Sequence, residues 1–143
     1  MDDDRRAALV TGAAGGIGRA VAARLEADGM DVLAVAPARG QIGREGDARA
    51  VVRRLEVDAG ILATAVCPGY VRTPLVERQV ADQAKAHGVP EERVLDEVIL
   101  APQPVKRLIE PDEVAGVVAF LAGPGGRAFS GVPVPMDLAW TAR

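Results

Sequence analysis

The stretch of sequence that decides the fold covers residues 7–18 and reads Ala7-Ala8-Leu9-Val10-Thr11-Gly12-Ala13-Ala14-Gly15-Gly16-Ile17-Gly18. Its first four residues are apolar, as expected of a buried strand. The glycines follow at once, and Ile17, Val21 and Leu25 then recur at spacings of four, which predicts one buried face of a helix. A second apolar run covers residues 32–36. The order of strand, glycine-rich turn, helix and strand predicts a parallel strand pair with a helical crossover.

The rest of the chain continues this alternation. We expect strands at residues 61–67 and 132–136, and helices at about residues 47–57 and 75–87, from 90 onward and from 111 onward. Val114, Val117, Val118 and Leu121 are the expected buried face of the last helix. Pro133 restricts the final strand to an edge. The 143 residues therefore predict one domain, 1–143, of the α/β class.

The composition excludes several classes of protein. The net charge is -3 and no long basic run is present, which argues against a nucleic-acid partner. No apolar run is long enough to span a bilayer. The single cysteine, Cys67, cannot form an internal disulfide and is expected to be a small core residue of its strand. With an acidic amino terminus, these features predict a cytoplasmic protein.

The glycine run is the strongest signal of function. It has the form Thr11-Gly12-x-x-x-Gly16-Ile17-Gly18 and lies between a predicted strand and a predicted helix. Free backbone N–H groups and the helix dipole attract a phosphate to the amino terminus of a helix. Glycine is needed where a side chain would block the phosphate or the contact between helix and strand. The run therefore predicts a dinucleotide site, whereas a glycine cluster elsewhere would indicate only a tight turn.

This spacing resembles that of the short-chain dehydrogenase/reductase family, which has a Rossmann-like fold. A second similarity is the segment containing Pro68, Gly69 and Thr73, which looks like the family's Pro-Gly-x-Val-x-Thr-Pro motif. Further matches are Glu113-Val114-Ala115, Phe120-Leu121-Ala122, Ser130-Gly131 and Met136-Asp137. The resemblance covers about residues 7–36 and 56–143.

The resemblance implies a cofactor and a substrate. The cofactor would be NAD, with NADP left open, and its site would include Thr11, Gly12, Gly16, Ile17, Gly18, Pro68, Gly69 and Thr73. Residues 70–79 and the ending from Trp140 are most similar to bacterial 3-hydroxybutyrate dehydrogenases. In that group Gln79 would hold the carboxylate of a hydroxy acid and Tyr70 would lie near the same pocket. A homo-oligomer is also implied, and no metal-site spacing is present.

The family's catalytic residues have no counterpart in this sequence. They are Ser, Tyr and Lys with a supporting Asn, and the Lys follows the Tyr by four residues so that it lowers the Tyr pKa for proton transfer. Pro74 stands four residues after Tyr70, which is the chain's one tyrosine, and the sequence contains no asparagine. The absent central block falls at residues 37–46. We therefore expect no catalytic residue and no turnover by the chain alone.

Other departures concern the cofactor and the sheet. Ala36 and Pro37 stand where a member of the family that prefers NAD usually has an acidic residue. Arg39 is interpreted as a solvent-exposed surface residue. Leu138 and Ala139 replace the glycines of a usual Asp-Gly-Gly. The absent block would contain strands 3, 4 and 5 of the family's sheet. We therefore expect a truncated parallel sheet in which the remaining strands, in the family's numbering, have the order 2-1-6-7. Three interpretations stay open: an oxidoreductase homologue without activity, a non-enzymatic dinucleotide-binding or oligomer-forming module, and a gene remnant.

Overall fold

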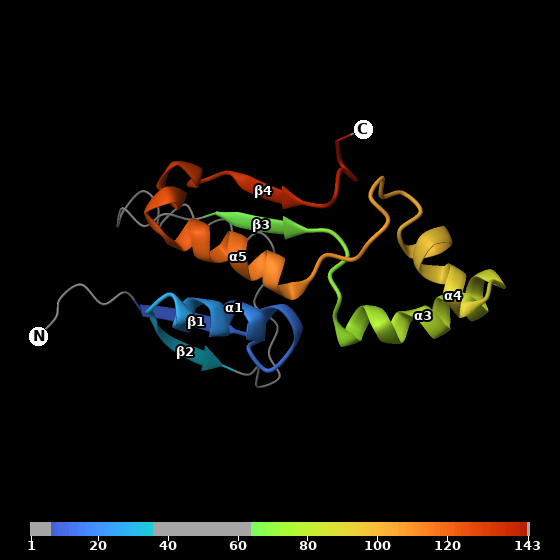
Figure 1. Cartoon of the computed structure of the whole chain (residues 1–143), viewed down its shortest axis with the longest axis horizontal. Coiled ribbons are helices and arrows are strands. Elements are labelled where there is room, and N and C mark those ends of the chain that lie inside the picture. Colours follow the sequence, from blue (N-terminus) through green and yellow to red (C-terminus); the bar gives the residue numbers. More distant parts are fainter. Residues whose placement is uncertain (1–6, 36–63, 143) are drawn as a thin grey trace, which may run out of the picture.

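The computed structural model describes residues 7–35 and 64–142, and the predictions for the loop 37–46, the helix 47–57 and Arg39 lie outside them. The described elements are β1 (Ala7–Thr11), α1 (Gly16–Ala27), β2 (Asp31–Val35), β3 (Ala65–Pro68), α3 (Pro74–His87), α4 (Glu91–Val94), the π-helical turn η1 (Leu95–Ile99), α5 (Pro111–Ala122), the 3₁₀ turn η2 (Pro124–Phe129) and β4 (Pro133–Met136). Strands and helices alternate (Figure 1), which confirms the predicted α/β class.

The strands form two separate parallel pairs. β1 pairs with β2, with Ala7 opposite Asp31, and β3 pairs with β4, with Ala65 opposite Pro133. Both pairings agree with the sequence analysis. Within the described residues no ladder joins β1 to β3, so the single sheet of order 2-1-6-7 is not found.

Two helices connect the two strand pairs. Helices α1 and α5 lie side by side, each against one strand pair (Figure 1). The contact between α1 and α5 therefore joins the two strand pairs.

Small side chains make the contact between α1 and α5. Ala115 and Ala119 of α5 are buried in one cluster with Val21, Ala22 and Leu25 of α1. The predicted face of α5 was therefore partly wrong, because Val117, Val118 and Leu121 are only half-buried. Val114 is buried as predicted, in a separate cluster with Val71 and Ile109.

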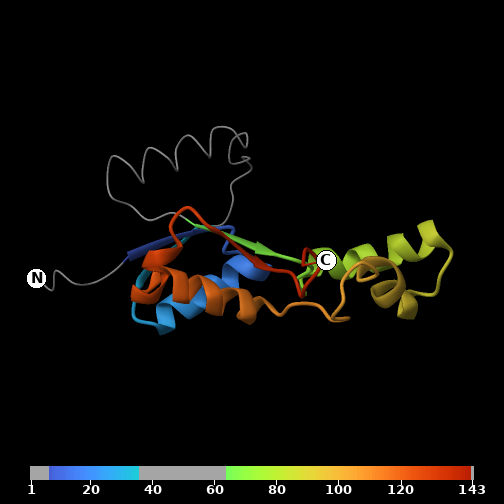
Figure 2. The same ribbon diagram turned by 90° about the horizontal axis from the view of Figure 1, so that it is seen from above.

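Helices α3 and α4 extend away from the strands at one end of the molecule (Figures 1 and 2). The Thr73 side chain accepts a 3.5 Å hydrogen bond from the N–H of Val76 and caps α3. Gly88 ends α3 with φ 65°, a left-handed conformation that favours glycine. A buried cluster holds α3, α4, η1 and the linker after η1 together. Its members are Val76, Val94, Ile99, Leu100 and Leu108.

Cys67 is exposed, so the prediction of a core residue was wrong. Side chains alternate along β3: Ala65 and Cys67 are exposed, while Val66 packs against the cluster beside α5. The apolar run gave no information on which of the two faces a helix would cover. Among the described residues, no helix has both the length and the apolarity that crossing a membrane requires.

Candidate functional site

The glycine loop connects β1 to α1 and opens toward solvent. Gly15 precedes α1 and, being glycine, provides no side chain to cap the first turn. The N–H groups of Gly16, Ile17 and Gly18 in that turn are therefore available to an outside acceptor. A Cβ added at Gly12 or Gly15 would meet nothing within 4 Å. The loop thus has an open side with free donors, which suits a phosphate.

The floor of the loop is tightly packed. A Cβ added at Gly18 would lie 2.7 Å from the carbonyl carbon of Gly12, closer than real Cβ atoms come to other heavy atoms. The backbone of α1 can therefore approach the end of β1 only because residue 18 has no side chain. Ile17 is half-buried and contacts both the cluster beside α1 and the cluster beside β3. Thr11 is the last residue of β1, immediately before the loop.

Gly16 and Thr73 bring the two predicted cofactor segments together. A Cβ on Gly16 would lie 3.1 Å from the Cγ2 methyl of Thr73, and Gly16 itself has φ 44°. Thr73 follows β3 and caps α3, so it is fixed by an element far away in the sequence. The structure therefore places the Thr73 segment directly beside the glycine loop.

The Pro68–Gly69 turn is enclosed on two sides. Pro68 ends β3, and the N–H of Gly69 donates a 3.0 Å hydrogen bond to the carbonyl of Met136 at the end of β4. A Cβ on Gly69 would lie 3.2 Å from Cα of Asp137 and 3.6 Å from Oε1 of Gln103. The approach of Asp137 favours a small residue at position 69, whereas the contact with Gln103 is at an ordinary van der Waals distance. Gln103 was not singled out by the sequence analysis, since one polar residue between prolines gives no pattern.

Tyr70 stacks on Trp140 in the carboxyl-terminal tail. Their ring centroids are 5.6 Å apart with an interplanar angle of 15°. Asp137 holds the tail by accepting hydrogen bonds from the Thr141 hydroxyl at 2.6 Å and the Thr141 N–H at 2.9 Å. Both hydrogen bonds lower the pKa of Asp137, and the bond from the hydroxyl has the larger effect. The tail is therefore fastened against the residue that the resemblance places near the substrate.

Two residues between Asp137 and Trp140 have an unusual backbone. Leu138 has φ 52° and Ala139 has φ 69°. Their positions correspond to the glycines of the Asp-Gly-Gly sequence that this chain lacks. Gln79, the other predicted substrate residue, lies exposed on α3.

Two ion pairs hold the start of α5, one to the segment after β3 and one to the linker just before the helix. The Nε of Arg72 donates a 2.8 Å hydrogen bond to Glu110, and Arg107 binds the carboxylate of Glu113 through both terminal nitrogens at 2.7 and 2.8 Å. Hydrogen bonds from Arg107, and then from the N–H of Glu110, lower the pKa of Glu113 to about 2. The side chains of these pairs are about half exposed, so their role is chiefly to orient the two segments.

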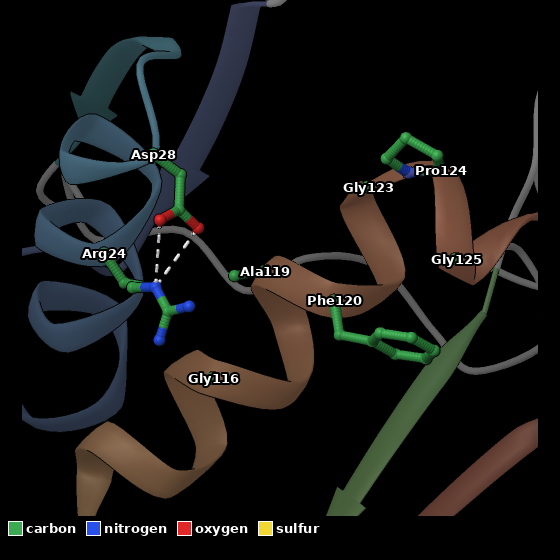
Figure 3. A pocket seen from close by; sticks show the side chains of 8 residues that line it. All are labelled: Arg24, Asp28, Gly116, Ala119, Phe120, Gly123, Pro124 and Gly125. Carbon is green, nitrogen blue, oxygen red and sulfur yellow. Dashed lines mark hydrogen bonds and ion pairs between the residues drawn. The ribbon is translucent and has the colours of Figure 1, made fainter.

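A shallow hollow of about 530 Å³ lies elsewhere, where α1 and α5 end (Figure 3). Its lining is Arg24, Asp28, Gly116, Ala119, Phe120, Gly123, Pro124 and Gly125. The Nε of Arg24 is bound to both carboxylate oxygens of Asp28, at 3.2 and 3.1 Å. The glycine loop stands at the opposite end of α1, so this hollow is not part of the candidate site. No group of three His, Cys, Asp or Glu that could hold a metal occurs in residues 7–35 and 64–142.

Residues 8–115 match the profile of the NAD dependent epimerase/dehydratase family. The match contains the glycine loop, the Pro68–Gly69 turn and Thr73. The chain belongs to this family. Its relatives and structural neighbours are short-chain dehydrogenases and reductases, which confirms the resemblance seen in the sequence.

Two relatives of this family member share one enzyme name. The chain is 46% identical over 90 residues to D-beta-hydroxybutyrate dehydrogenase of Rhizobium meliloti (strain 1021), covering 62% of this chain and 35% of the relative. It is 38% identical over 84 residues to D-beta-hydroxybutyrate dehydrogenase of Cupriavidus necator, covering 59% of this chain and 33% of the relative. The chain therefore spans about a third of the length of the curated relatives that it matches.

Solved structures confirm the fold of this family member. A variant of actinorhodin polyketide ketoreductase with NADPH aligns with a TM-score of 0.78 at 19% identity, covering 98% of each chain. A C-terminal deletion mutant of Thermoplasma acidophilum aldohexose dehydrogenase aligns with a TM-score of 0.75 at 19% identity, covering 100% of each chain.

Proposed function

We propose that this chain binds a nicotinamide dinucleotide with its pyrophosphate at the amino terminus of α1. The contact between Gly16 and Thr73 carries the proposal, because it brings the loop before α1 and the segment after β3 to one place. The residues present fit the group. The open space at Gly12 and Gly15 leaves room for a phosphate, and the first turn of α1 is not capped by a side chain.

Each segment would hold one part of the cofactor. The N–H groups of Gly16, Ile17 and Gly18 bind the pyrophosphate, and Thr11 and Gly12 shape the turn that leads to them. Pro68, Gly69 and Thr73 line the nicotinamide end. NAD is the cofactor we propose, and when bound it supplies the hydride acceptor. Tyr70 and Gln79 are proposed to contact a hydroxy acid such as 3-hydroxybutyrate, on the resemblance to the dehydrogenases named above.

We also propose that the chain alone does not oxidise such an acid. Oxidation of a hydroxyl requires a group that takes its proton as the hydride leaves. The sequence contains one tyrosine and two lysines, and neither lysine follows Tyr70 by four residues. Without that Tyr–Lys pair, a cofactor and a hydroxy acid could both bind and no proton would be transferred.

A titration with NADH, in which calorimetry measures the heat of binding, tests the binding proposal. We expect saturable binding to the purified chain, and loss of binding in Gly16→Asp, which adds a side chain and a negative charge to the phosphate site. NADPH in a parallel titration tests the choice of cofactor, and light scattering of the same sample measures any homo-oligomer. Absence of saturable NADH binding to the folded protein would refute the proposal.

An activity assay tests the second part. With NAD and 3-hydroxybutyrate at saturating concentrations, we expect no NADH formation above the level given by Gly16→Asp. Turnover that depends on Gly16 would show that other residues of this chain move the proton.

A further inference from the structure

Gln103 is the only buried polar side chain among the described residues, with no exposed surface at all. It lies in the linker between η1 and α5, where Pro104, Val105 and Lys106 are exposed. Its Nε2 donates hydrogen bonds to the carbonyls of Val105 at 2.6 Å and Arg107 at 2.7 Å. The linker is thus folded around the amide of Gln103.

The oxygen of the same amide has no hydrogen-bond partner. Oε1 of Gln103 is fully buried and unpaired, and it faces Gly69, whose added Cβ would lie 3.6 Å away. An unpaired buried acceptor is costly, and most buried polar groups have a partner. A hydrocarbon side chain at this position would avoid the cost of the unpaired oxygen. The presence of glutamine therefore indicates a role that requires its shape and its two N–H donors.

Gly69 contacts both this linker and the tail. Asp137 also lies close to the position of its added Cβ, and its own N–H is bound to the carbonyl of Met136. The contact between the linker and the turn continues along both segments. The N–H of Ile109 donates to the carbonyl of Tyr70 at 2.9 Å, and the N–H of Arg72 donates to the carbonyl of Ile109 at 2.8 Å. Gln103 therefore supports one end of this contact, and Ile109 supports the other.

We propose that Gln103 is a positioning residue for the nicotinamide end of the cofactor site. By folding the linker against Gly69, its amide fixes how far the Pro68–Gly69 turn stands from the glycine loop. The pyrophosphate site at α1 does not depend on it, because no described contact joins Gln103 to the loop before α1. This inference rests on the proposed dinucleotide binding and adds a residue that acts on one part of the ligand.

Two ligands separate this role from a general structural one. ADP-ribose contains the adenine, the riboses and the pyrophosphate of the cofactor and lacks nicotinamide. In Gln103→Leu, we expect the affinity for NADH to fall on the order of tenfold, because the two hydrogen bonds that fold the linker against the turn are lost. The affinity for ADP-ribose should change by less than about twofold, within the scatter of such measurements.

Two further variants keep the test decisive. Gln83→Leu on α3 replaces a half-buried glutamine away from the turn and should leave both affinities unchanged. If Gln103→Leu does not give a cooperative melt, Gln103→Met keeps an unbranched side chain of similar length without the amide and should show the same selective loss. An equal loss for both ligands, or no loss for either, would overturn the proposal. Failure of the unmodified chain to bind ADP-ribose would instead overturn the proposed function, and this inference with it.

Discussion

The Cγ2 methyl group of Thr73 lies against Gly16, only 3.1 Å from where a Cβ of that residue would be. Gly16 begins α1 and has φ 44°, while Thr73 caps α3 from the other half of the chain. Residue 16 therefore combines two conditions that favour glycine, a left-handed backbone and a close side-chain neighbour. These conditions can be separated by mutation, since only one of them involves Thr73.

Gly16→Ala should reduce the free energy of unfolding by about 1–3 kcal/mol, from backbone strain and the contact with Thr73. Adding Thr73→Ser removes the Cγ2 methyl and keeps the hydroxyl that caps α3. The double variant should recover part of the lost stability, namely the steric part, in urea unfolding curves. Thr73→Ser alone is the control, with little change expected. If the double variant is no more stable than Gly16→Ala, the methyl contact has no influence on residue 16.

Ala139→Gly should stabilise the protein by about 0.5–1 kcal/mol, because Ala139 is exposed and adopts a φ that glycine reaches without strain. Thermal melting provides the measurement. Ala128→Gly, at an exposed position within the 3₁₀ turn η2, is the matched control and should destabilise. A lower melting temperature for Ala139→Gly would contradict the assignment of strain to the tail.

The ion pair of Glu113 should make stability depend on acid. Its pKa is lowered to about 2 in the folded protein from an ordinary value of 4.5. The stabilisation is fully present above pH 4.5 and is lost as the pH falls toward 2, since the unfolded chain then binds more protons. Melting temperatures of the native protein and Glu113→Gln should therefore differ at pH 6 and converge near pH 2. A difference that stays constant across this range would show that the pair makes no pH-dependent contribution.

Trp140 is the one tryptophan of the chain, so its fluorescence reports on the tail. Tyr70→Leu removes the stacked ring and should shift the emission to longer wavelengths, with a loss of about 0.5–1.5 kcal/mol in stability. Phe129→Leu disturbs the other aromatic pair, with Phe120, and should leave the emission unchanged. An unaltered spectrum in Tyr70→Leu would show that the tail is held by Asp137 without help from the stack.

The sequence predicted the parts of this fold that depend on local chemistry. The glycine loop, the end of α3 at His87 and the start of α5 at Pro111 each depend on the conformational preferences of one or two residues. The strand–helix–strand pattern also predicted the pairing of β1 with β2, and the resemblance to the family predicted the pairing of β3 with β4.

The errors concern contacts between distant segments. Cys67 and the buried face of α5 depend on which surface another element covers, and an apolar run does not contain that information. The four-stranded order was not found among the described residues, since whether two strand pairs join depends on contacts between segments far apart in the sequence. Gln103 was missed for a related reason, since burial of one polar residue leaves no periodic signal.

The seam of alanines between α1 and α5 also has a consequence for the folding of the chain. A single pair of strands is marginal in water without a packed partner. Among residues 7–35 and 64–142, one helix packs on each strand pair, and these two helices meet each other at Ala22, Ala115 and Ala119. During synthesis the segment that contains β1, α1 and β2 emerges from the ribosome well before α5 is made. Until α5 is synthesised, the face of α1 that Ala115 and Ala119 cover stays exposed, and chaperones or proteases could bind it during that interval.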